Sequence, residues 1–497
     1  MSEPGLSALQ RGLILATATT STALYAMTVT IANVSLPQIQ GSLSATQDQI
    51  AWIVTFNIVA TAVATPTTGW LVARFGQRKV MLWGVFGFIV STFLCGAATG
   101  LGELVLYRVV QGATGAPLVP LAQAVVLASF PRHRHGFATA IYGLGVVLGP
   151  LIAPTIGGYL SEAYSWRWVF WMVVPAGVVC FVSVWFVVRD TERGEKVRLD
   201  WTGFLALSVA IASFQLMLDR GERNDWFESV ETLVEAALVI GALYVFIAHS
   251  LTAKQPFLSL GMLRDRNFTL GLFIVLIFGM LNFTPMVLFP SMLQGLQGYP
   301  DSIVGLLLGA RSFGTFLGFM VMLFASHLDP RLWMLLGFGL QAASGFHMAG
   351  FSAEVPTWNV AVASAVQGLG VGFLWVPITL VTFATLAPRY LAEATALFHL
   401  LRNLGSSMHI SLTVAVVVHT TQINYAELTT LVTPYSERLL VPEIAGGFHT
   451  GTMGGLAGLS GEIARQAAMI GYVNGFYLYA WTGVLVLPLV VFVRRRK

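Results

Sequence analysis

Three arginines lie inside long apolar segments of the sequence, at Arg108, Arg311 and Arg402. A guanidinium group in hydrocarbon costs on the order of 3 kcal/mol, so each side chain is expected to face a cavity or a polar partner. Gln111 follows Arg108 by three residues and lies close to the same helix face. We expect these four residues to contact a bound substrate or to take part in proton movement. The alternatives are a snorkelling side chain at Arg108 and a structural hydrogen-bond network around Arg402.

Titratable groups that could carry protons are scarce in the apolar segments. His399 and His409 share a segment with the third arginine, and histidine is the side chain that titrates nearest to neutral pH. Each of them could instead be a buried histidine with satisfied hydrogen bonds. No Asp or Glu lies near the middle of an apolar segment, but Asp48 and Glu103 lie near segment ends and could bind protons if a cavity reaches them.

Arginines without central carboxylates leave the interior positively charged. Such an interior favours anionic or neutral amphiphiles over lipophilic dications. Aromatic and methionine side chains would give a flexible apolar lining that suits varied ligands, and the alternative is that they face lipid. The candidates are Phe283, Phe289, Trp375, Phe398, Met280, Met286 and Met292.

The composition is that of a membrane protein. The chain has 497 residues, of which 56% are hydrophobic and 10% are charged, whereas a soluble domain has about 25% charged residues. The basic residues lie in short loops and form no patch for nucleic acid. Cys95 and Cys180 both lie in apolar segments, so neither a disulfide nor a metal site is expected. No phosphate-binding loop and no catalytic cluster is apparent, so we expect neither enzyme activity nor a cofactor.

The hydrophobic segments predict an all-α integral membrane fold, because about 20 apolar residues cross a bilayer as a helix. Fourteen spans are predicted near residues 12–36, 48–73, 79–99, 102–128, 136–161, 168–188, 201–219, 230–250, 268–291, 302–326, 331–351, 357–384, 390–419 and 470–493. The longest stretch between spans, 420–468, is expected to carry short helices. No cleavable signal peptide is expected.

Loop charge predicts the orientation. With both termini in the cytoplasm, nineteen Lys and Arg residues fall on the cytoplasmic side and five on the outer side. Cytoplasmic loops carry such an excess of basic residues, so we expect both termini to be cytoplasmic.

An internal repeat divides the chain into halves. Residues 111–115, Gln-Gly-Ala-Thr-Gly, are echoed by Gln-Gly-Leu-Gly at 367–370, and a proline follows each at nearly the same distance. If the fourth span matches the twelfth, two spans have been inserted between two six-span halves. We therefore expect an N-terminal bundle (1–190), a two-helix insertion (191–255) and a C-terminal bundle (256–497) that carries the outer stretch 420–468. Repeated halves around a central site are common in secondary transporters.

The fifth predicted span carries small residues at every fourth position. Gly145, Gly149, Ala153 and Gly157 share one helix face, which lets a second helix approach closely in lipid. Pro150, Pro154 and Gly158 lie in the same run, and we expect the two prolines to interrupt and bend the helix, as membrane helices tolerate. The run is interpreted as a hinge, and the alternative is a packing helix with no moving role.

Several motifs resemble those of the major facilitator superfamily. Residues 69–79, with Gly69, Arg74, Gly76 and Arg78, resemble the signature loop after the second span, which the resemblance identifies as a gating motif. Residues 104–112 resemble the fourth-span motif, and 143–158 resemble the fifth-span motif of exporters. Residues 30–37, which include Asn33, resemble the first-span motif of the fourteen-span drug:proton antiporters, so the resemblance adds Asn33 to the substrate and proton pathway.

The motifs also depart from the family pattern. Ala73 and Thr28 stand where the family usually has Asp, and Ala153 replaces a usual Gly. The first change weakens a charge-based gate, and the second removes a carboxylate often suspected in coupling.

The resemblance extends to the inner-membrane subunits of Emr-type multidrug efflux systems. It implies a proton-driven exporter of drugs and hydrophobic toxic compounds in the bacterial inner membrane, with a periplasmic membrane-fusion adaptor and an outer-membrane channel as partners. Two other functions stay open: export of one metabolite, such as an organic acid or a siderophore precursor, and a sensor or scaffold on a transporter fold.

Overall fold

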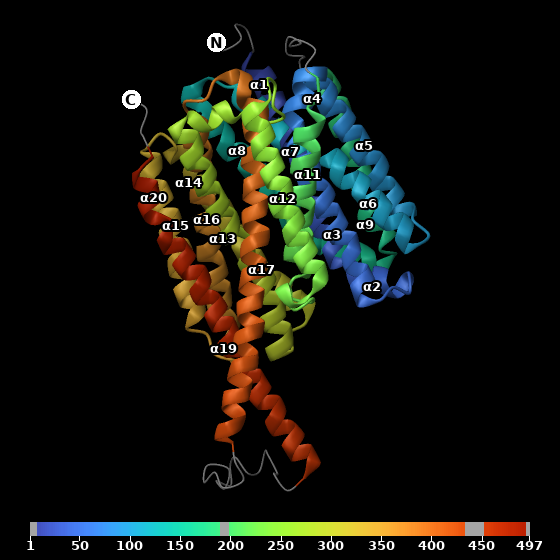
Figure 1. The fold of residues 1–497 in the computed structure, drawn as a ribbon, viewed down its shortest axis with the longest axis vertical. Helices are drawn as coiled ribbons and strands as arrows, with labels where there is room; N and C mark the ends of the chain where they lie inside the picture. Colours follow the sequence, from blue (N-terminus) through green and yellow to red (C-terminus); the bar gives the residue numbers. More distant parts are fainter. Residues whose placement is uncertain (1–6, 189–197, 433–451, 494–497) are drawn as a thin grey trace.

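The computed structural model describes residues 7–188, 198–432 and 452–493. These residues form α-helices joined by turns and four short 3₁₀ helices, and none of them lies in a β-strand. The helices pack side by side along one long axis (Figure 1).

Ten helices form the first part of the chain. They are α1 (Ala8–Val34), α2 (Leu36–Ser42), α3 (Gln47–Ala64), α4 (Thr67–Phe75), α5 (Gln77–Ala97), α6 (Leu101–Gly115), α7 (Leu118–Ser129), α8 (His135–Ala163), α9 (Arg167–Trp171) and α10 (Val173–Val187). Helix α1 packs on α7, α8 and α10, and α6 packs on α3 and α5.

The rest of the chain holds a helix pair and a second bundle. The pair is α11 (Trp201–Arg220) and α12 (Val230–Thr252), and the bundle is α13 (Arg266–Gln297), α14 (Asp301–Ala325), α15 (Pro330–Ala349), α16 (Thr357–Phe383), α17 (Leu391–Leu431), α19 (Met453–Leu485) and α20 (Leu487–Val491). Helix α16 packs on α14 and α15, and α17 packs on α13 and α19.

Helices occupy each of the fourteen predicted spans. Within the described ranges, ten are long and apolar enough to cross a membrane, or eleven if the bent pair α3–α4 counts as one. That pair bends by 54° at Pro66, where the missing N–H and the ring break the helix. Large apolar side chains on the outer faces, such as Phe186, Tyr244 and Phe324, are exposed as contact with lipid requires. The number fourteen itself stays a prediction.

The prolines of the fifth predicted span do not interrupt their helix, so the expected interruption was wrong, while the expected bend stays a prediction. Helix α8 runs without a break from His135 to Ala163, through Pro150 and Pro154. A proline removes one backbone hydrogen bond, and a membrane helix retains its course when neighbouring helices support it. Helix α1 packs along α8 and supplies that support.

The short helices expected in 420–468 were also wrong where the structure describes that stretch. Helices α17 and α19 continue through it as one long hairpin, which projects beyond the rest of the bundle (Figure 1). No proline interrupts α17 before its end at Leu431, and Thr452 caps the start of α19 by accepting from Gly455 N–H. The tip of the stretch, 433–451, lies outside the described residues. The hairpin projects from the end opposite to that where α1 begins and α20 lies.

Candidate functional site

A cavity of ≈ 380 Å³ lies between the two bundles. Its walls come from α1, α3, α7 and α8 on one side and from α13, α14, α16 and α17 on the other. Gln215 of α11 also contributes, so the helix pair takes part in the wall. Aromatic and aliphatic side chains surround two arginines, Arg311 and Arg402, and no carboxylate appears among the described lining residues. The cavity is therefore positively charged and largely apolar.

Arg311 of α14 is bound on both sides of its guanidinium group. Its Nε donates to Gln367 Oε1 (2.6 Å), and its Nη2 donates to the carbonyl and the side-chain oxygen of Asn282 (2.8 and 2.6 Å). Gln367, the glutamine of the second repeat, is fully buried. Arg311 is thus held by the protein while one face of the side chain lines the cavity.

Arg402 of α17 is held more loosely. Its Nη2 donates to Asn403 Oδ1 (3.1 Å), and its Cζ lies 5.5 Å from the centroid of the Trp375 ring, within the range of a cation–π contact. Arg402 Nε is buried and has no hydrogen-bond partner among the described residues, and the same holds for Trp375 Nε1. A buried donor left without a partner costs about 1–3 kcal/mol.

Polar contacts join the two bundles beside the cavity, through His399, Gln123 and Thr379. We name this group the cavity floor. His399 Nε2 hydrogen-bonds to Gln123 Oε1 of α7 at 2.5 Å, and Gln123 Nε2 donates to Thr379 Oγ1 of α16 at 3.3 Å. Because the amide nitrogen of Gln123 donates to Thr379, its oxygen accepts from His399 Nε2–H, which leaves Nδ1 as the lone-pair nitrogen. His399 Nδ1 has no partner in the described ranges. One glutamine of the first bundle thus connects two helices of the second.

Arg108 and Gln111 lie in a separate network inside the first bundle. Arg108 Nη1 donates to Gln111 Oε1 (2.6 Å), and Gln111 Nε2 donates to Thr92 Oγ1 (2.7 Å). Arg108 Nε reaches the carbonyl of Ile53 (3.4 Å), and Asn57 donates to the Arg108 carbonyl (2.7 Å). Arg108 is 1% exposed and does not line the cavity.

Two further predicted pathway residues, His409 and Glu103, are not among the residues that line the cavity. His409 Nδ1 bonds to Thr284 Oγ1 (2.7 Å) and Nε2 to Thr482 Oγ1 (3.2 Å), so both of its ring nitrogens have partners. Glu103 is exposed in the first turn of α6, where it accepts from the N–H and hydroxyl of Thr99 (both 2.9 Å). The backbone places Asn33 near the end of α1 and Asp48 in the first turn of α3. The side chains of Asn33 and Asp48 lie outside the described structure.

The bundles also meet at the end where α1 begins, and the predicted gating motif lies there. A Cβ atom at Gly69 of α4 would lie 2.8 Å from Glu393 Cβ and 2.9 Å from Glu393 Cα, so α17 touches α4 backbone to backbone. Glu393 accepts from the N–H and the hydroxyl of Ser259 in the segment that follows α12. On the other side of this end, a Cβ atom at Gly136 would lie 2.6 Å from Ser326 Oγ. The structure is therefore closed at this end. We name the contacts of Gly69 with Glu393 and of Gly136 with Ser326 the inner seam.

The rest of the gating motif shapes the turn between α4 and α5. Arg74 lies in the last turn of α4. Gly76 has φ 84°, a left-handed conformation that favours glycine. Arg78 donates to the carbonyl of Trp185 on α10, and its Cζ lies 5.5 Å from the centroid of the Trp185 ring.

The glycine face of α8 packs within the first bundle. Cβ atoms at Gly145, Gly149 and Gly157 would lie 1.9 Å from Thr19, 2.7 Å from Ala23 and 2.3 Å from Ile31, all on α1. The spacing from one pair to the next is the same on both helices, four residues and then eight. Helices α1 and α8 therefore run in the same direction in close contact. Pro150 of α8 lines the cavity, and the side-chain environments of Pro154 and Gly158 lie outside the described structure.

A different glycine of α8 faces the second bundle. A Cβ atom at Gly143 would lie 2.3 Å from Phe319 of α14. Helix α8 thus joins α1 on one face and meets the other bundle on another.

Helix α11 contacts both bundles near its C-terminal end. Asp219 accepts a hydrogen bond from Thr55 of α3, and the Leu218 carbonyl accepts from Ser411 Oγ of α17 (2.8 Å). Helix α11 therefore contacts both bundles.

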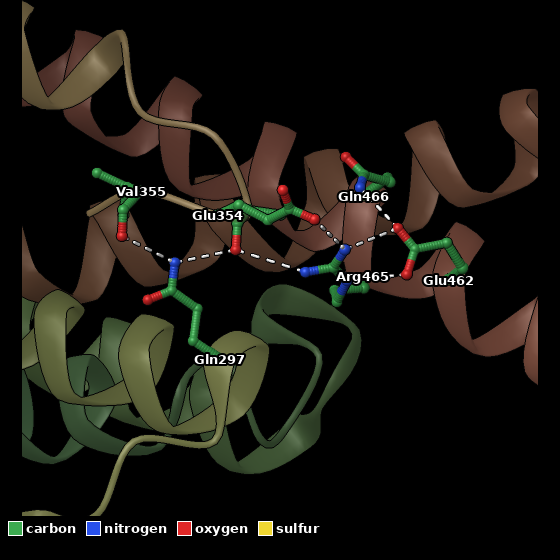
Figure 2. A network of polar contacts seen from close by, with 7 residues as sticks. Gln297, Glu354, Val355, Glu462, Arg465 and Gln466 are labelled. Atoms are coloured by element: carbon green, nitrogen blue, oxygen red, sulfur yellow. Dashed lines mark hydrogen bonds and ion pairs between the residues drawn. The ribbon is translucent and has the colours of Figure 1, made fainter. Parts of the chain in front are cut away.

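The base of the projecting hairpin is fixed by the polar network in Figure 2. Arg465 of α19 forms an ion pair with Glu462 (2.9 Å) and lies 3.7 Å from Glu354 in the turn before α16. The carbonyl of Ala353 in that turn accepts from Gln297 Nε2 at the end of α13 (2.9 Å) and from Arg465 Nη1 (3.4 Å). These contacts join α19 to the second bundle where the hairpin leaves it.

Sequence reasoning missed several residues of the cavity and the seam. Gln123, Asn282, Gln215 and Glu393 are polar or charged residues in apolar segments, a signal that was readable in the sequence. Their partners come from distant parts of the chain, so the pairing itself was not readable.

Known proteins are similar to this chain in sequence. The family model "Major Facilitator Superfamily" matches residues 18–409. The multidrug export protein EmrB of Escherichia coli K12 is 33% identical over 412 residues, which cover 82% of this chain and 80% of EmrB. EmrB of Haemophilus influenzae is 32% identical over 95% of this chain and 93% of its own length. The fatty acid resistance protein FarB of Neisseria gonorrhoeae is 31% identical, over 82% of this chain and 81% of FarB.

Solved structures show the same fold at low sequence identity. The proton:xylose symporter XylE superposes with a TM-score of 0.64 at 12% identity, over 98% of this chain and 97% of XylE. The human organic anion transporter MFSD10 has a TM-score of 0.63 at 11% identity, over 95% and 99% of the two chains. The chain is therefore a multi-span membrane transporter that belongs to the major facilitator superfamily, in the branch that contains the EmrB proteins.

Proposed function

We propose that this protein is a proton-coupled secondary exporter of hydrophobic toxic compounds and drugs, with a preference for anionic or neutral amphiphiles. The observation that carries the proposal is the cavity between the bundles, where Arg311 and Arg402 stand among apolar side chains with no described carboxylate. A positive, low-dielectric cavity stabilises an anionic head group, and its apolar lining accepts the rest of an amphiphile.

The relatives support this cargo. EmrB is named for multidrug export and FarB for resistance to fatty acids, which are anionic amphiphiles at neutral pH. Each is about one-third identical to this chain over most of its length, so transport of small molecules of this kind is the function that the relatives favour.

The structure is consistent with alternating access. The bundles touch at the inner seam and at the cavity floor, through Gly69, Glu393, Gln123 and His399. We propose that these contacts break when the cavity opens to the other side, and that residues 1–190 and 256–497 move as two bodies. The close contact of α1 with the glycine face of α8 would make those two helices move together in the first body.

We further propose a bacterial inner-membrane location with both termini in the cytoplasm, as the excess of basic residues in those loops predicts. The α17–α19 hairpin would then extend into the periplasm. Its position supports a role as the contact for a periplasmic membrane-fusion adaptor, which would connect the protein to an outer-membrane channel in a tripartite pump.

The test is transport by the purified full chain in proteoliposomes under an imposed pH gradient. Decanesulfonate carries one permanent negative charge on a ten-carbon chain, and decamethonium is a dication with one permanent positive charge at each end of a ten-carbon chain. We expect gradient-dependent transport of decanesulfonate to exceed that of decamethonium and to stop when an uncoupler removes the gradient. Transport of decamethonium alone would contradict the charge preference, and transport that ignores the gradient would contradict proton coupling.

A further inference from the structure

Two hydrogen-bond donors of the cavity wall have no partner in the described part of the chain. They are the Nε–H of Arg402 on α17 and the Nε1–H of Trp375 on α16. Both side chains line the cavity, and Trp375 is 7% exposed. Arg402 Cζ lies 5.5 Å from the centroid of the Trp375 ring, so the two donors belong to one small region of the wall. Unpaired buried donors also occur elsewhere in the described chain, for example at Arg331 Nε and Trp166 Nε1, and this couple differs from those because both of its side chains line the cavity.

The second cavity arginine does not share this property. Arg311 Nε and Nη2 both donate to protein oxygens, of Gln367 and Asn282. Two of the three guanidinium nitrogens of Arg311 therefore have protein acceptors, whereas Arg402 has an acceptor for Nη2 and a buried Nε without one.

The surroundings of the two donors suit an amphiphile. The Trp375 ring lies 6.0 Å from that of Phe278 and 5.9 Å from that of Phe398, between centroids. Phe283 and Met286 of α13 also line the cavity. A polar head at the donors would thus lie next to an apolar surface for its tail.

We propose that Arg402 and Trp375 form a head-group subsite that binds a carboxylate, or a comparable oxyanion, of an amphiphilic substrate. Both donor atoms are covered in this conformation, so the cavity wall must rearrange locally for a ligand to reach them. Arg402 then contributes a charge-assisted hydrogen bond from its guanidinium group, and Trp375 contributes a neutral one from Nε1. The proposal rests on the proposed export function and specifies where and by which atoms the anionic head is recognised. Arg311 gives the cavity a second positive charge but makes no such bond.

His399 stands beside the subsite, with its ring centroid 5.8 Å from that of Trp375. Since its Nε2 donates to Gln123, its Nδ1 is an acceptor and does not count among the donors to an anion. The subsite therefore has two donors, and both can be removed by conservative substitutions.

The experiment measures binding to the purified full-length protein in nanodiscs, without a pH gradient. Decanoate and decanamide have the same carbon skeleton, and only decanoate carries a charge. We expect the wild-type protein to bind decanoate at least about tenfold more tightly than decanamide. This comparison requires no variant. Equal affinities for the two probes would overturn the proposal.

Two variants then separate the head group from the tail. Trp375→Phe keeps an aromatic ring and removes the N–H, and Arg402→Gln removes the charge. We expect each to weaken decanoate binding about fivefold to tenfold or more and to change decanamide binding less than about twofold. Trp166→Phe is the matched control, because Trp166 Nε1 is also buried without a described partner but the side chain lies outside the cavity. This control should leave both affinities unchanged.

The outcomes distinguish the subsite from the export function. If Trp375→Phe and Arg402→Gln weaken both probes equally, or neither, the subsite is wrong even when the wild-type protein transports drugs. If they weaken decanoate alone while the wild-type protein shows no gradient-driven transport, the subsite stands and the proposed function fails.

Discussion

Arg108 and Arg402 are both arginines inside membrane helices, but the protein satisfies them in different ways. Arg108 is 1% exposed and lies in a network of hydrogen bonds inside the first bundle. Arg402 lines the cavity, donates to one side-chain acceptor, Asn403, among the described residues, and keeps a buried Nε without a described partner. A buried arginine can therefore stabilise the fold or bind a ligand. Guanidinium N–H groups without a protein acceptor distinguish the second role from the first.

The glutamines of the internal repeat extend this comparison. Gln111 accepts from Arg108 within one helix, and Gln367 accepts from Arg311 of another helix (both 2.6 Å). The two bundles therefore place a guanidinium group against the same repeat position by different routes. In the first bundle neither member of the pair lines the cavity, while in the second Arg311 does.

The largest expected effect is a difference in the free energy of unfolding between variants of Arg108 and Arg402. Arg108→Gln should lower the free energy of unfolding by about 3 kcal/mol, because it leaves Gln111 and the surrounding carbonyls without their charged donor. Arg402→Gln should change it by less than about 1 kcal/mol, since little of the protein is bonded to that group. Denaturant titration of both variants in nanodiscs measures the difference. Equal losses would contradict the division into a structural and a ligand-binding arginine.

Substitution of the two repeat glutamines should also destabilise the first bundle more than the second, but by a smaller difference in the free energy of unfolding. Gln111→Leu leaves a fully buried guanidinium nitrogen unpaired and is expected to cost about 2 kcal/mol. Gln367→Leu should cost about 1 kcal/mol, because Arg311 retains Asn282 and can turn towards the cavity. The same titration checks this order, and a larger loss for Gln367→Leu would reverse it.

Gln123 tests whether the cavity floor is a conformational contact rather than a packing contact. Gln123→Leu removes the bonds to His399 and Thr379 and should shift the population away from the closed inner seam by about 1 kcal/mol, roughly fivefold. Accessibility of a cysteine that replaces Ser326, which nearly keeps the size of the serine, to a water-soluble thiol reagent measures the shift against a variant that carries the cysteine alone. Unchanged accessibility would show that the floor contact does not hold the seam.

The smallest expected effect is a pH-dependent change in stability at Asp200. This residue precedes α11 and takes no part in the hydrogen bonds of Arg108, Arg311 or Arg402. Burial alone would raise the pKa of Asp200, but hydrogen bonds from Gly203 N–H, His249 and Phe257 N–H together lower it. Because the pKa is lowered in the folded state, the stabilisation is present above the unfolded value of about 3.9 and is lost as the pH falls through the folded value.

Asp200→Asn should therefore lower the free energy of unfolding by about 1 kcal/mol at pH 7, and this difference from the wild-type protein should start to shrink below about pH 4 and vanish only below the lowered pKa of the folded state. Unfolding measured across that range checks the prediction. A difference that grows as the solution is acidified would show the opposite linkage.

Much of the fold was readable from the sequence, because hydrophobic length and loop composition determine where helices can cross a bilayer. The helices at all fourteen predicted spans follow from that rule. The α17–α19 hairpin was missed because residues 420–431 and 453–468 are too polar or too glycine-rich to look like spans, yet nothing in them stops a helix that packs against a partner.

The site was less predictable. The expectation that Arg311 and Arg402 reach a cavity depended only on the cost of burying charge in lipid, which acts on each residue separately. The pairing of Gln123 with His399 joins residues 276 positions apart and depends on how the bundles dock. The position of Arg108 outside the cavity likewise depends on the packing of α3 and α5 around α6, which no local pattern encodes.

The most direct test of the account is the movement of the two bundles against each other. Spin labels at the exposed positions His133 and His327 span the inner seam, and labels at Gly102 and Ser352 span the opposite end. Distances in nanodiscs should change in opposite directions when a transported anion or a change in pH shifts the population: as the inner pair separates, the outer pair should approach. If the two distances change together, or if the inner pair stays fixed during transport, then the bundles do not alternate and the account is contradicted.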